Sequence, residues 1–383
     1  MHVVHVNCGI DAEGRGPEAL LRAWPTVPLV AEAIAQAGAR VTVLQASRFA
    51  AEYRHEGVDY RFIAEPRLSR KYGAGIMPWR LAAAARRLAP DVIHLNGLGF
   101  PLHLAAITGL GVPVLVQDHA SAPGGKRGRL RRWSLRGAAG VAFTAKEQAE
   151  EFRRAGELPD ALPVFAVPES STRFAAGDRG AARSSAGVWG DPALLWVGRL
   201  NANKDPLTIL DAIRRVLPRL PNLQFWCAYG EADLLPAVEQ VLREEPALAE
   251  HVHLLGALPH EKMEQLYRAC DLFILGSHRE GSGYSLIEAL ACGLGTVVSD
   301  IPPFRALTGE GKIGALAPCG DAEAFAEGIM TLAERPREET RAATLEHFER
   351  ELSPAALGRK LVETYHAAIR AYRSANPRSA RET

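Results

Sequence analysis

The stretch that decides the fold is residues 271–300, "DLFILGSHREGSGYSLIEALACGLGTVVSD". An apolar run of strand length comes first, a glycine-rich turn follows, a segment of helical period begins near Tyr284, and a second apolar run closes the stretch. Strand, helix and strand in this order form a parallel βαβ unit. The same alternation continues on both sides, which predicts an α/β protein built on parallel sheets with helices on both faces.

The alternation fills two long blocks of the chain. Residues 171–192, between the blocks, are small, polar and rich in glycine, which is typical of a linker. We expect two doubly wound, Rossmann-like domains at residues 1–170 and 193–355, a linker at 171–192, and a helix at 356–375 that could pack back on the first domain. Because ligands bind such sheets at the carboxyl ends of the strands, the two domains are expected to face each other across one cleft.

The composition is that of a soluble globular protein, with 47% hydrophobic and 23% charged residues. At ~150 residues per domain, a chain of 383 residues is long enough for two or three domains. A formal net charge of +1 provides no overall field for nucleic acid, which is not an expected partner. Five cysteines without a C-x-x-C pair, and an amino-terminal apolar run too short for a signal peptide, predict a reducing, cytoplasmic setting.

Two acidic residues in residues 271–300 are candidates for ligand binding. Glu280 follows an expected strand, and Gly281 and Gly283 allow close backbone approach before the next helix. The free N–H groups of that helix start, at Gly283, Tyr284 and Ser285, form an anion site. Glu288 lies about one turn further on the same side, in an apolar run where its charge needs a partner. The plainer alternative is that Glu280 is a solvated loop residue and Glu288 a surface position on a half-buried helix. The two acids with glycines between them favour a ligand-binding site instead.

A second candidate is "VGRLNANKDP", residues 197–206, directly after the expected strand "ALLWV". Arg199 and Lys204 could neutralise two neighbouring phosphates, and Asp205 and Pro206 mark the start of the next helix. Taken alone, such a pair of cations is more often solvated surface, and its position at the carboxyl end of a strand makes the two interpretations about equal.

Together these segments resemble a known family. "VGRLNANKDPLTILDAI", "LLGALPHEKMEQLYRACDLFILGSHREGSGYSLIEALACGLGTVVSD" and "LAPCGDAEAFAEGI" look like the carboxyl-terminal domain of family 4 retaining glycosyltransferases with the glycosyltransferase-B fold. The likeness covers nearly all of residues 193–335, and the E-x7-E motif of that family corresponds to Glu280 and Glu288.

The resemblance implies a role for each matched residue. Arg199 and Lys204 would hold the diphosphate of a nucleotide sugar, and Glu288 would bind the ribose hydroxyls. Glu280 would face the donor sugar, Leu258 would lie against the base, and the backbone from Gly283 to Ser285 would contact sugar or phosphate.

The amino-terminal half resembles the family more weakly, through "PDVIHLNG", "VPVLVQDHASAP" and "VAFTAKEQAEEFRRAG". His119 falls where the family has a histidine at the reaction centre, although a histidine satisfied at a strand end would look the same. The chain also departs from the family: "VPESS" stands where relatives often have Asn-Gly before the linker.

A basic segment, residues 126–136, contains six Lys and Arg and no acid. The first 170 residues carry 21 Lys and Arg against 16 Asp and Glu, net +5, and the remainder carries 24 against 28, net −4. A solvated basic face is the default interpretation of the segment. The alternative is weak docking on an anionic membrane, such as the inner face of the cell membrane, or on a phosphorylated acceptor.

The expected activity is metal-independent, retaining transfer of a hexose from a nucleotide diphosphate sugar to an acceptor hydroxyl, in glycan biosynthesis. The acceptor class, a sugar, a lipid-linked molecule or a small molecule, stays open. No D-x-D motif stands at an expected site, so cations and a helix start would balance the phosphate charge without a metal or other cofactor. An epimerase or a phosphorylase of the same fold is the nearest rival. A nicotinamide oxidoreductase would carry G-x-G-x-x-G after its first strand, and this chain does not have that motif. A non-catalytic interaction module would have no need of Glu280, Glu288 and Lys204.

Overall fold

The computed structural model describes residues 1–65, 76–124 and 127–377, and the chain divides into two compact units. Unit 1 comprises Met1–Ser171 together with the chain from Pro354 onward, and unit 2 comprises Thr172–Ser353. Each unit is a parallel, doubly wound α/β structure, which confirms the fold class expected from the sequence. The two units are described one at a time.

Unit 1 is built on a sheet that, within the described residues, has eight strands in the order β3-β4-β2-β1-β5-β6-β7-β8. Its strands are β1 (His2–Asn7), β2 (Arg40–Ser47), β3 (Ala51–His55), β4 (Val58–Ala64), β5 (Val92–Asn96), β6 (Val114–Gln117), β7 (Gly140–Phe143) and β8 (Val164–Ala166). Its helices are α1 (Pro17–Ala23), α2 (Thr26–Gln36), α3 (Trp79–Arg87), α4 (Pro101–Thr108), α5 (Gly128–Ser134), the 3₁₀ turn η1 (Leu135–Gly137), α6 (Gln148–Arg154) and α16 (Pro354–Ala375).

The hairpin of β3 and β4 was not expected from the sequence. β3 pairs antiparallel with β4 at the edge of an otherwise parallel sheet. An edge strand keeps one side in water, and the residues of β3 are accordingly exposed or half-buried. This strand therefore has no continuous apolar run by which the sequence could show it.

Unit 2 is built on a sheet that has six strands within the described residues, in the order β11-β10-β9-β12-β13-β14. Its strands are β9 (Ala193–Gly198), β10 (Gln224–Tyr229), β11 (Val252–Gly256), β12 (Leu272–Leu275), β13 (Gly295–Ser299) and β14 (Ala315–Ala317). Its helices are α7 (Arg179–Ala186), α8 (Pro206–Val216), α9 (Leu235–Glu244), α10 (Pro246–Ala249), α11 (His260–Ala269), α12 (Tyr284–Cys292), α13 (Pro302–Leu307), α14 (Ala322–Ala333) and α15 (Arg337–Glu351).

The strand order places a topological switch point in each unit. In unit 2 the chain adds β10 and β11 on one side of β9 and then crosses over to add β12, β13 and β14 on the other. The loops that leave β9 and β12 therefore lie side by side at the carboxyl ends of these two strands, joined by hydrogen bonds such as His278 N–H to the Asn203 carbonyl at 2.8 Å, at the position where open α/β sheets bind ligands. In unit 1 the equivalent position lies between β1 and β5.

Residues 171–192 do not form a linker, contrary to the expectation. Thr172 and the residues after it belong to unit 2, and α7 packs on α11. The Asp178 side chain caps α7 by accepting the Ala181 N–H at 2.6 Å, and Gly187 ends the helix with a φ of 65°. Only Ala182 of α7 is buried, so the sequence of this helix shows no apolar stripe.

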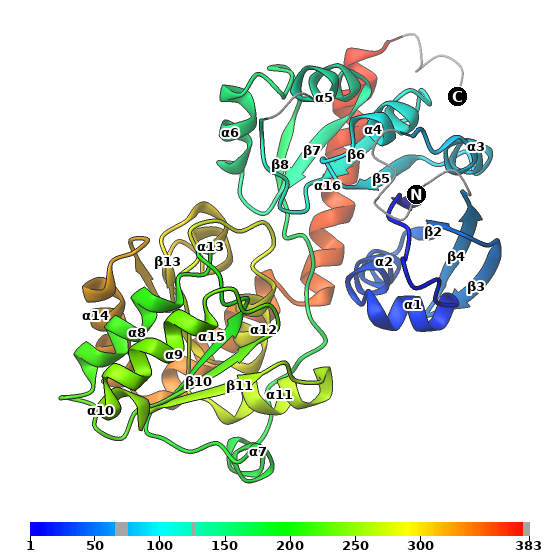
Figure 1. The fold of residues 1–383 in the computed structure, drawn as a ribbon. Helices are drawn as coiled ribbons and strands as arrows, with labels where there is room; N and C mark the ends of the chain where they lie inside the picture. The colour runs from blue at the N-terminus through cyan, green and yellow to red at the C-terminus, as the bar shows by residue number, and fades with distance from the viewer. Residues whose placement is uncertain (66–75, 125–126, 378–383) are drawn as a thin grey trace. The chain divides into compact units, whose positions relative to one another are not determined.

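The last helix belongs to unit 1. Figure 1 shows α16, coloured orange to red, along the sheet of unit 1, and it packs against α2. Leu357, Leu361 and Tyr365 of α16 share one hydrophobic core with strand residues such as Val41. At Gly358 a Cβ atom would lie only 2.1 Å from the Ala33 carbonyl oxygen, so the two helices approach at a point where only glycine fits.

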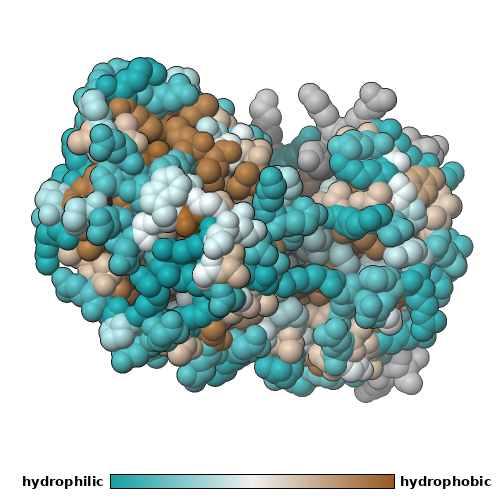
Figure 2. All heavy atoms as spheres, turned by 90° about the horizontal axis from the view of Figure 1, so that it is seen from below, coloured by the Kyte–Doolittle hydropathy of each residue, from teal (hydrophilic) through white to brown (hydrophobic). Residues whose placement is uncertain are grey.

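The distribution of hydrophobic residues on the surface and the state of the cysteines can both be compared with what the composition suggested. Figure 2 shows hydrophilic residues spread over most of one face, with hydrophobic residues gathered in separate areas between them. Among the described residues no helix has both the length and the apolar content that crossing a lipid bilayer requires. All five cysteines are free thiols, as the absence of a C-x-x-C pair suggested.

Candidate active site

Lys204 and Glu280 meet at the switch point of unit 2. Lys204 lies in the loop after β9, Glu280 lies in the loop after β12, and the Lys204 ammonium forms an ion pair with the Glu280 carboxylate. Ser277 Oγ also donates to Glu280 Oε1, at 2.7 Å. Both charged side chains are half-buried, with 15% of Lys204 and 13% of Glu280 exposed. The attraction between the two charges offsets part of the free energy that each one loses when it leaves water.

The loop that carries Lys204 is fixed by its own side chains. Asn201 Oδ1 accepts the Lys204 N–H at 3.2 Å. The Asp205 side chain accepts the Thr208 N–H at 3.4 Å and the Thr208 hydroxyl at 2.7 Å, and Pro206 occupies the first turn of α8. The sequence prediction of a helix cap at Asp205 and Pro206 is confirmed, and Lys204 lies one residue before the cap, two before the first residue of α8.

The start of α12 is next to Glu280 in the chain. Gly283 is the residue before the helix and has a φ of 61°, a conformation that favours glycine. A Cβ atom there would lie 2.7 Å from Leu307 Cδ1, so the packing also requires glycine. The N–H groups of Gly283, Tyr284 and Ser285 have no acceptor within the helix, so they could donate to an anion; that they do so stays a prediction.

Glu288 lies in the second turn of α12 and is only 7% exposed. Burial raises the pKa of the Glu288 carboxyl from 4.5 to about 7, and an interaction with the Tyr267 hydroxyl opposes the rise. That hydroxyl donates to the Ser285 carbonyl at 3.2 Å. The carboxylate thus lacks a strong charge partner within unit 2, which is the situation that hydroxyl donors of a ligand would relieve.

Arg199 and Leu258 lie at the same edge of the sheet, in the loops that follow β9 and β11. Arg199 follows β9, is 65% exposed, and pairs with Glu231 at 3.6 Å. Leu258 lies in the loop between β11 and α11, half-buried against the core of unit 2. β11 is two strands away from β9, so Leu258 lies further out along the same edge of the sheet than Lys204.

His119 belongs to unit 1, two residues after the end of β6. Its Nδ1 forms a short contact with Glu169 Oε1, and its Nε2 lies 3.1 Å from Asn96 Oδ1. The Asn96 amide in turn donates to His5 Nε2 at 2.6 Å. Since both of its ring nitrogens face acceptor oxygens, His119 is arranged to donate from both, as an imidazolium does.

The electrostatics of His119 agree with this arrangement. Burial alone would lower the pKa of His119, but the hydrogen bond and the charge of Glu169, with a contribution from Asp118, raise it above 6.5. The neighbouring His5 is fully buried, and burial lowers the pKa of His5 to about 4. Of these two histidines, His119 therefore holds a proton more readily, because it lies next to the Glu169 carboxylate.

The sequence pointed to His119 and Glu288 but missed their partners. Glu169 lies in "VPESS", which stands where relatives often have Asn-Gly. This difference from the family was the one signal in the sequence that could have drawn attention to Glu169. Asn96 ends β5, a position at which polar side chains often reach a site. Tyr267 lies within an expected helix, where a tyrosine looks like ordinary core.

The basic segment at residues 126–136 is only partly a solvated face. Lys126 lies outside the described residues. Arg131 is buried, pairs with Glu157, and donates from Nε to the Leu98 carbonyl at 3.1 Å, so its role is structural. Arg127, Arg129 and Arg136 are exposed, and between them Leu130 and Trp133 are 36% and 56% exposed. We call these five exposed residues the α5 face.

No cluster of three or more His, Cys, Asp or Glu side chains that could hold a metal ion is found in the described part of the chain. His251 and His253, which have a metal-like spacing, instead contact the Leu223 carbonyl and Gln224 Oε1, each at 2.7 Å.

Comparison with protein families gives two matches that together span most of the chain. Residues 182–346 match the model described as "Glycosyl transferases group 1", and residues 23–168 match the one described as "Glycosyl transferase 4-like domain". The first match includes Arg199, Lys204, Glu280 and Glu288, and the second includes His119.

Curated proteins of known activity are also similar. A GDP-mannose:cellobiosyl-diphosphopolyprenol alpha-mannosyltransferase of Xanthomonas campestris is 27% identical over 294 residues, which cover 73% of this chain and 74% of that protein. A D-inositol 3-phosphate glycosyltransferase of Mycobacterium sp. (strain KMS) is 31% identical over 210 residues, or 53% of this chain and 46% of the relative. The chain thus spans about half the length of the second relative.

Solved structures show the same fold. Sucrose-phosphate synthase from Thermosynechococcus elongatus matches 97% of this chain and 100% of that chain with a TM-score of 0.68 at 17% identity. Anabaena HepE in complex with UDP and glucose matches 95% and 99% with a TM-score of 0.66 at 18% identity. At these identities the likeness concerns the fold alone.

Replacing Glu169 by Gln is expected to lower the pKa of His119. The neutral amide removes the charge that holds the proton, so burial becomes the dominant influence. Titration of the His119 ring protons by NMR, assigned with a His119→Gln variant, measures the change. Glu56→Gln, at an exposed position of unit 1, is the control and should leave the midpoint unchanged. An unaltered midpoint in Glu169→Gln would contradict the assignment.

Glu288 is expected to make stability depend on pH. Because its folded pKa is raised, its contribution is fully present below pH 4.5 and is lost as the pH rises to about 7. The loss is roughly 3 kcal/mol, at about 1.4 kcal/mol per pKa unit. In urea unfolding at pH 4 and pH 8, the free energy of unfolding of Glu288→Gln should rise relative to that of the wild type by that amount between the two pH values. The exposed Glu323→Gln should not, and identical pH dependence in Glu288→Gln and wild type would refute the burial argument.

Proposed function

Because the chain belongs to the family 4 glycosyltransferases, we propose that it transfers a sugar from a nucleotide diphosphate sugar to an acceptor hydroxyl, with retention of the anomeric configuration. The names of its relatives, which are transferases and synthases, favour transfer over epimerisation or phosphorolysis.

The contact between Lys204 and Glu280 is the observation that carries this proposal. In a nucleotide sugar the anomeric carbon is bonded directly to the terminal phosphate oxygen. A cation that holds the phosphate and a carboxylate that holds the sugar hydroxyls must therefore be neighbours. The ion pair satisfies this requirement and keeps both groups ordered before the donor arrives, so less order has to be imposed on binding.

The other site residues take roles around this pair. Arg199, exposed in the same loop as Lys204, would turn from Glu231 toward the diphosphate. The N–H groups of Gly283, Tyr284 and Ser285 would receive a phosphate or sugar oxygen, and Glu288 would accept hydrogen bonds from the ribose hydroxyls. Leu258 would border the base.

In the proposed reaction the acceptor oxygen attacks the anomeric carbon from the side of the departing diphosphate, which accepts the hydroxyl proton. Lys204, Arg199 and the start of α12 stabilise the charge that develops on the diphosphate, so no metal ion is needed. His119 is proposed to donate from its imidazolium near the anomeric centre. Since Glu169 and Asn96 occupy both ring nitrogens, His119 must exchange one of these partners to do so.

A sugar nucleotide is the best-supported donor class. Anabaena HepE is described with UDP and glucose and with UDP-glucose, and the Xanthomonas relative is named for GDP-mannose. A thermal-shift screen of UDP-, GDP- and ADP-sugars is the direct comparison, because a ligand that binds only the folded state raises the melting temperature.

For the acceptor we propose a lipid-linked saccharide, met at the inner face of the cell membrane during glycan biosynthesis. Two observations support this class. The Xanthomonas relative is named for a diphosphopolyprenol acceptor. The α5 face combines the exposed Trp133 and Leu130 with the cations Arg127, Arg129 and Arg136, a pairing suited to the boundary of an anionic bilayer.

Lys204→Ala is expected to weaken donor binding by about 10- to 100-fold, because a charge-assisted contact contributes ~1.5–3 kcal/mol. Calorimetric titration with the best donor of the screen measures it, and Lys262→Ala on the exposed side of α11 is the control. Wild-type turnover should persist in excess EDTA. Unchanged affinity in Lys204→Ala would remove the site assignment, and abolition of turnover by EDTA would remove the metal-free mechanism.

The α5 face is expected to bind vesicles that contain an anionic lipid and to leave neutral vesicles unbound. Each cation near such a surface contributes ~1 kcal/mol, and the Trp133 ring adds apolar contact. Co-sedimentation should therefore fall in Trp133→Ala and persist in Trp189→Ala, which removes a similarly exposed tryptophan from unit 2. Equal and negligible sedimentation with anionic and neutral vesicles would contradict the proposal that the α5 face binds a membrane.

A further inference from the structure

Unit 2 has a pocket at the edge of its sheet opposite to the Lys204–Glu280 pair. The pocket has a volume of about 530 Å³, which is the size of a small-molecule site. Asp271 and Gly295, at the beginnings of β12 and β13, lie in its wall, whereas Glu280 follows the other end of β12. The first turns of α7 and α15 complete the wall.

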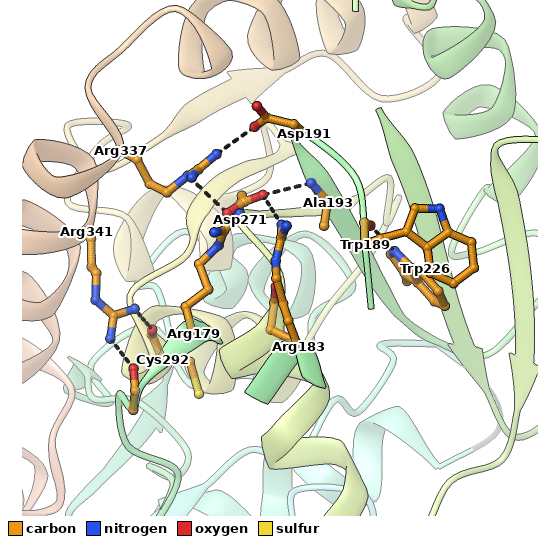
Figure 3. A network of polar contacts seen from close by, with 12 residues as sticks. Arg179, Arg183, Trp189, Asp191, Ala193, Trp226, Asp271, Cys292, Arg337 and Arg341 are labelled. Carbon is orange, nitrogen blue, oxygen red and sulfur yellow. Dashed lines mark hydrogen bonds and ion pairs between the residues drawn. The ribbon is translucent and has the colours of Figure 1, made fainter. Parts of the chain in front are cut away.

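Three arginines converge on one carboxylate in this wall. Figure 3 shows Arg179, Arg183 and Arg337 directed at Asp271, whose side chain is 3% exposed. Oδ1 contacts Arg179 Nε at 2.6 Å and Arg337 Nε at 3.0 Å. Oδ2 accepts from Arg183 at 2.8 Å and from the Ala193 N–H at 2.8 Å. One buried negative charge thus faces three guanidinium groups.

The lining as a whole is balanced, so the excess of positive charge is local to Asp271; the acids are Asp178, Asp191, Asp271 and Glu338, and the arginines are Arg179, Arg335, Arg337 and Arg341. Asp191 accepts from Arg337 at 2.7 Å, but its side chain is 75% exposed and water screens it. Asp178 is engaged as the cap of α7. Glu338 is exposed, and the pocket wall also includes the exposed Arg335.

Donor groups remain for a ligand. Arg179 meets Asp271 through Nε, and within the described residues its two terminal nitrogens have no hydrogen-bond or ion-pair partner. The Arg335 guanidinium, which also lines the pocket, makes no ion pair with any described residue. A guanidinium presents a planar fork of N–H groups that matches phosphate geometry. Apolar side chains of the same pocket, from Leu220, Leu272 and Leu332, offer a surface for the rest of a ligand.

We infer that this pocket binds a phosphate-bearing small molecule, with its phosphate between Arg179, Arg335 and Arg337. The ligand would be an effector and no substrate, because the pocket holds none of Lys204, Glu280 and Glu288.

The pocket is connected to the donor site through α12. The donor side of α12 begins at Tyr284, and Gly293, just after its other end, lines the pocket. Arg341 of α15 donates to the Cys292 and Gly177 carbonyls at 3.0 Å each, and α15 packs on α12. A ligand that bridges α7 and α15 would therefore fix the end of the helix that carries Glu288.

Calorimetric titration of the full chain with glucose 6-phosphate, inorganic phosphate and glucose tests the inference. The titration uses the Lys204→Ala variant, so that the donor site contributes little. We expect one molecule of glucose 6-phosphate per chain, weaker binding of inorganic phosphate because it lacks the contacts of the sugar, and no binding of glucose because it lacks the phosphate. Binding of neither phosphate compound, or a signal that is present in the wild type and absent in Lys204→Ala, would overturn the inference.

Charge variants locate the site. Arg335→Glu should weaken glucose 6-phosphate binding at least 10-fold, whereas Arg243→Glu on the outside of α9 should leave it unchanged. Arg179→Lys keeps a cation beside Asp271 but removes the fork, and is expected to weaken binding with little change in melting temperature. Equal affinity in Arg335→Glu, Arg179→Lys and the parent protein would place the ligand elsewhere and refute the proposal.

Discussion

The ion pair of Lys204 and Glu280 is the constraint on which the site depends. The two residues are 76 positions apart, and they meet because β9 and β12 are neighbouring strands on the two sides of the switch point. Each charge is half-buried and would be unfavourable alone. A donor that brings phosphate to the lysine and hydroxyls to the carboxylate exchanges one set of charge-assisted contacts for another, so opening the pair need not leave either charge unpaired.

In unit 1, His119 belongs to a chain of hydrogen-bonded and stacked side chains in which burial and a carboxylate have opposite effects on the pKa values. The residue is one member of a line of polar side chains that continues through Asn96 and His5 to His94, which stacks on His5 with a ring separation of 4.7 Å. His94 Nδ1 lies 2.6 Å from the Tyr365 hydroxyl of α16. Burial lowers the pKa values of His5 and His94, while Glu169 raises that of His119. The positive charge of the line is thereby confined to its end at the strand edge.

The sequence predicted what depends on local pattern. Central strands such as β9 and β12 are buried on both faces, so their apolar runs were visible, and the cap at Asp205 followed from residue type. Elements that bury few side chains could not be recognised from the sequence. Helix α7 buries one residue, and β3 is an edge strand whose residues are exposed or half-buried. Arg131 looked like one more surface cation because its partner, Glu157, lies 26 residues away. Glu169 and Tyr267 were missed for the same reason, since their partners are set by tertiary structure.

The return of α16 to unit 1 makes that unit discontinuous along the chain, whereas unit 2 is one uninterrupted segment. During synthesis the ribosome releases the whole of Thr172–Ser353 before the last helix emerges. Unit 2 can then fold while the apolar side of α2 in unit 1 still awaits Leu357, Leu361 and Ile369. Nascent chains caught at this stage would present the uncovered surface to chaperones, and the order of maturation would run from the middle of the polypeptide outward.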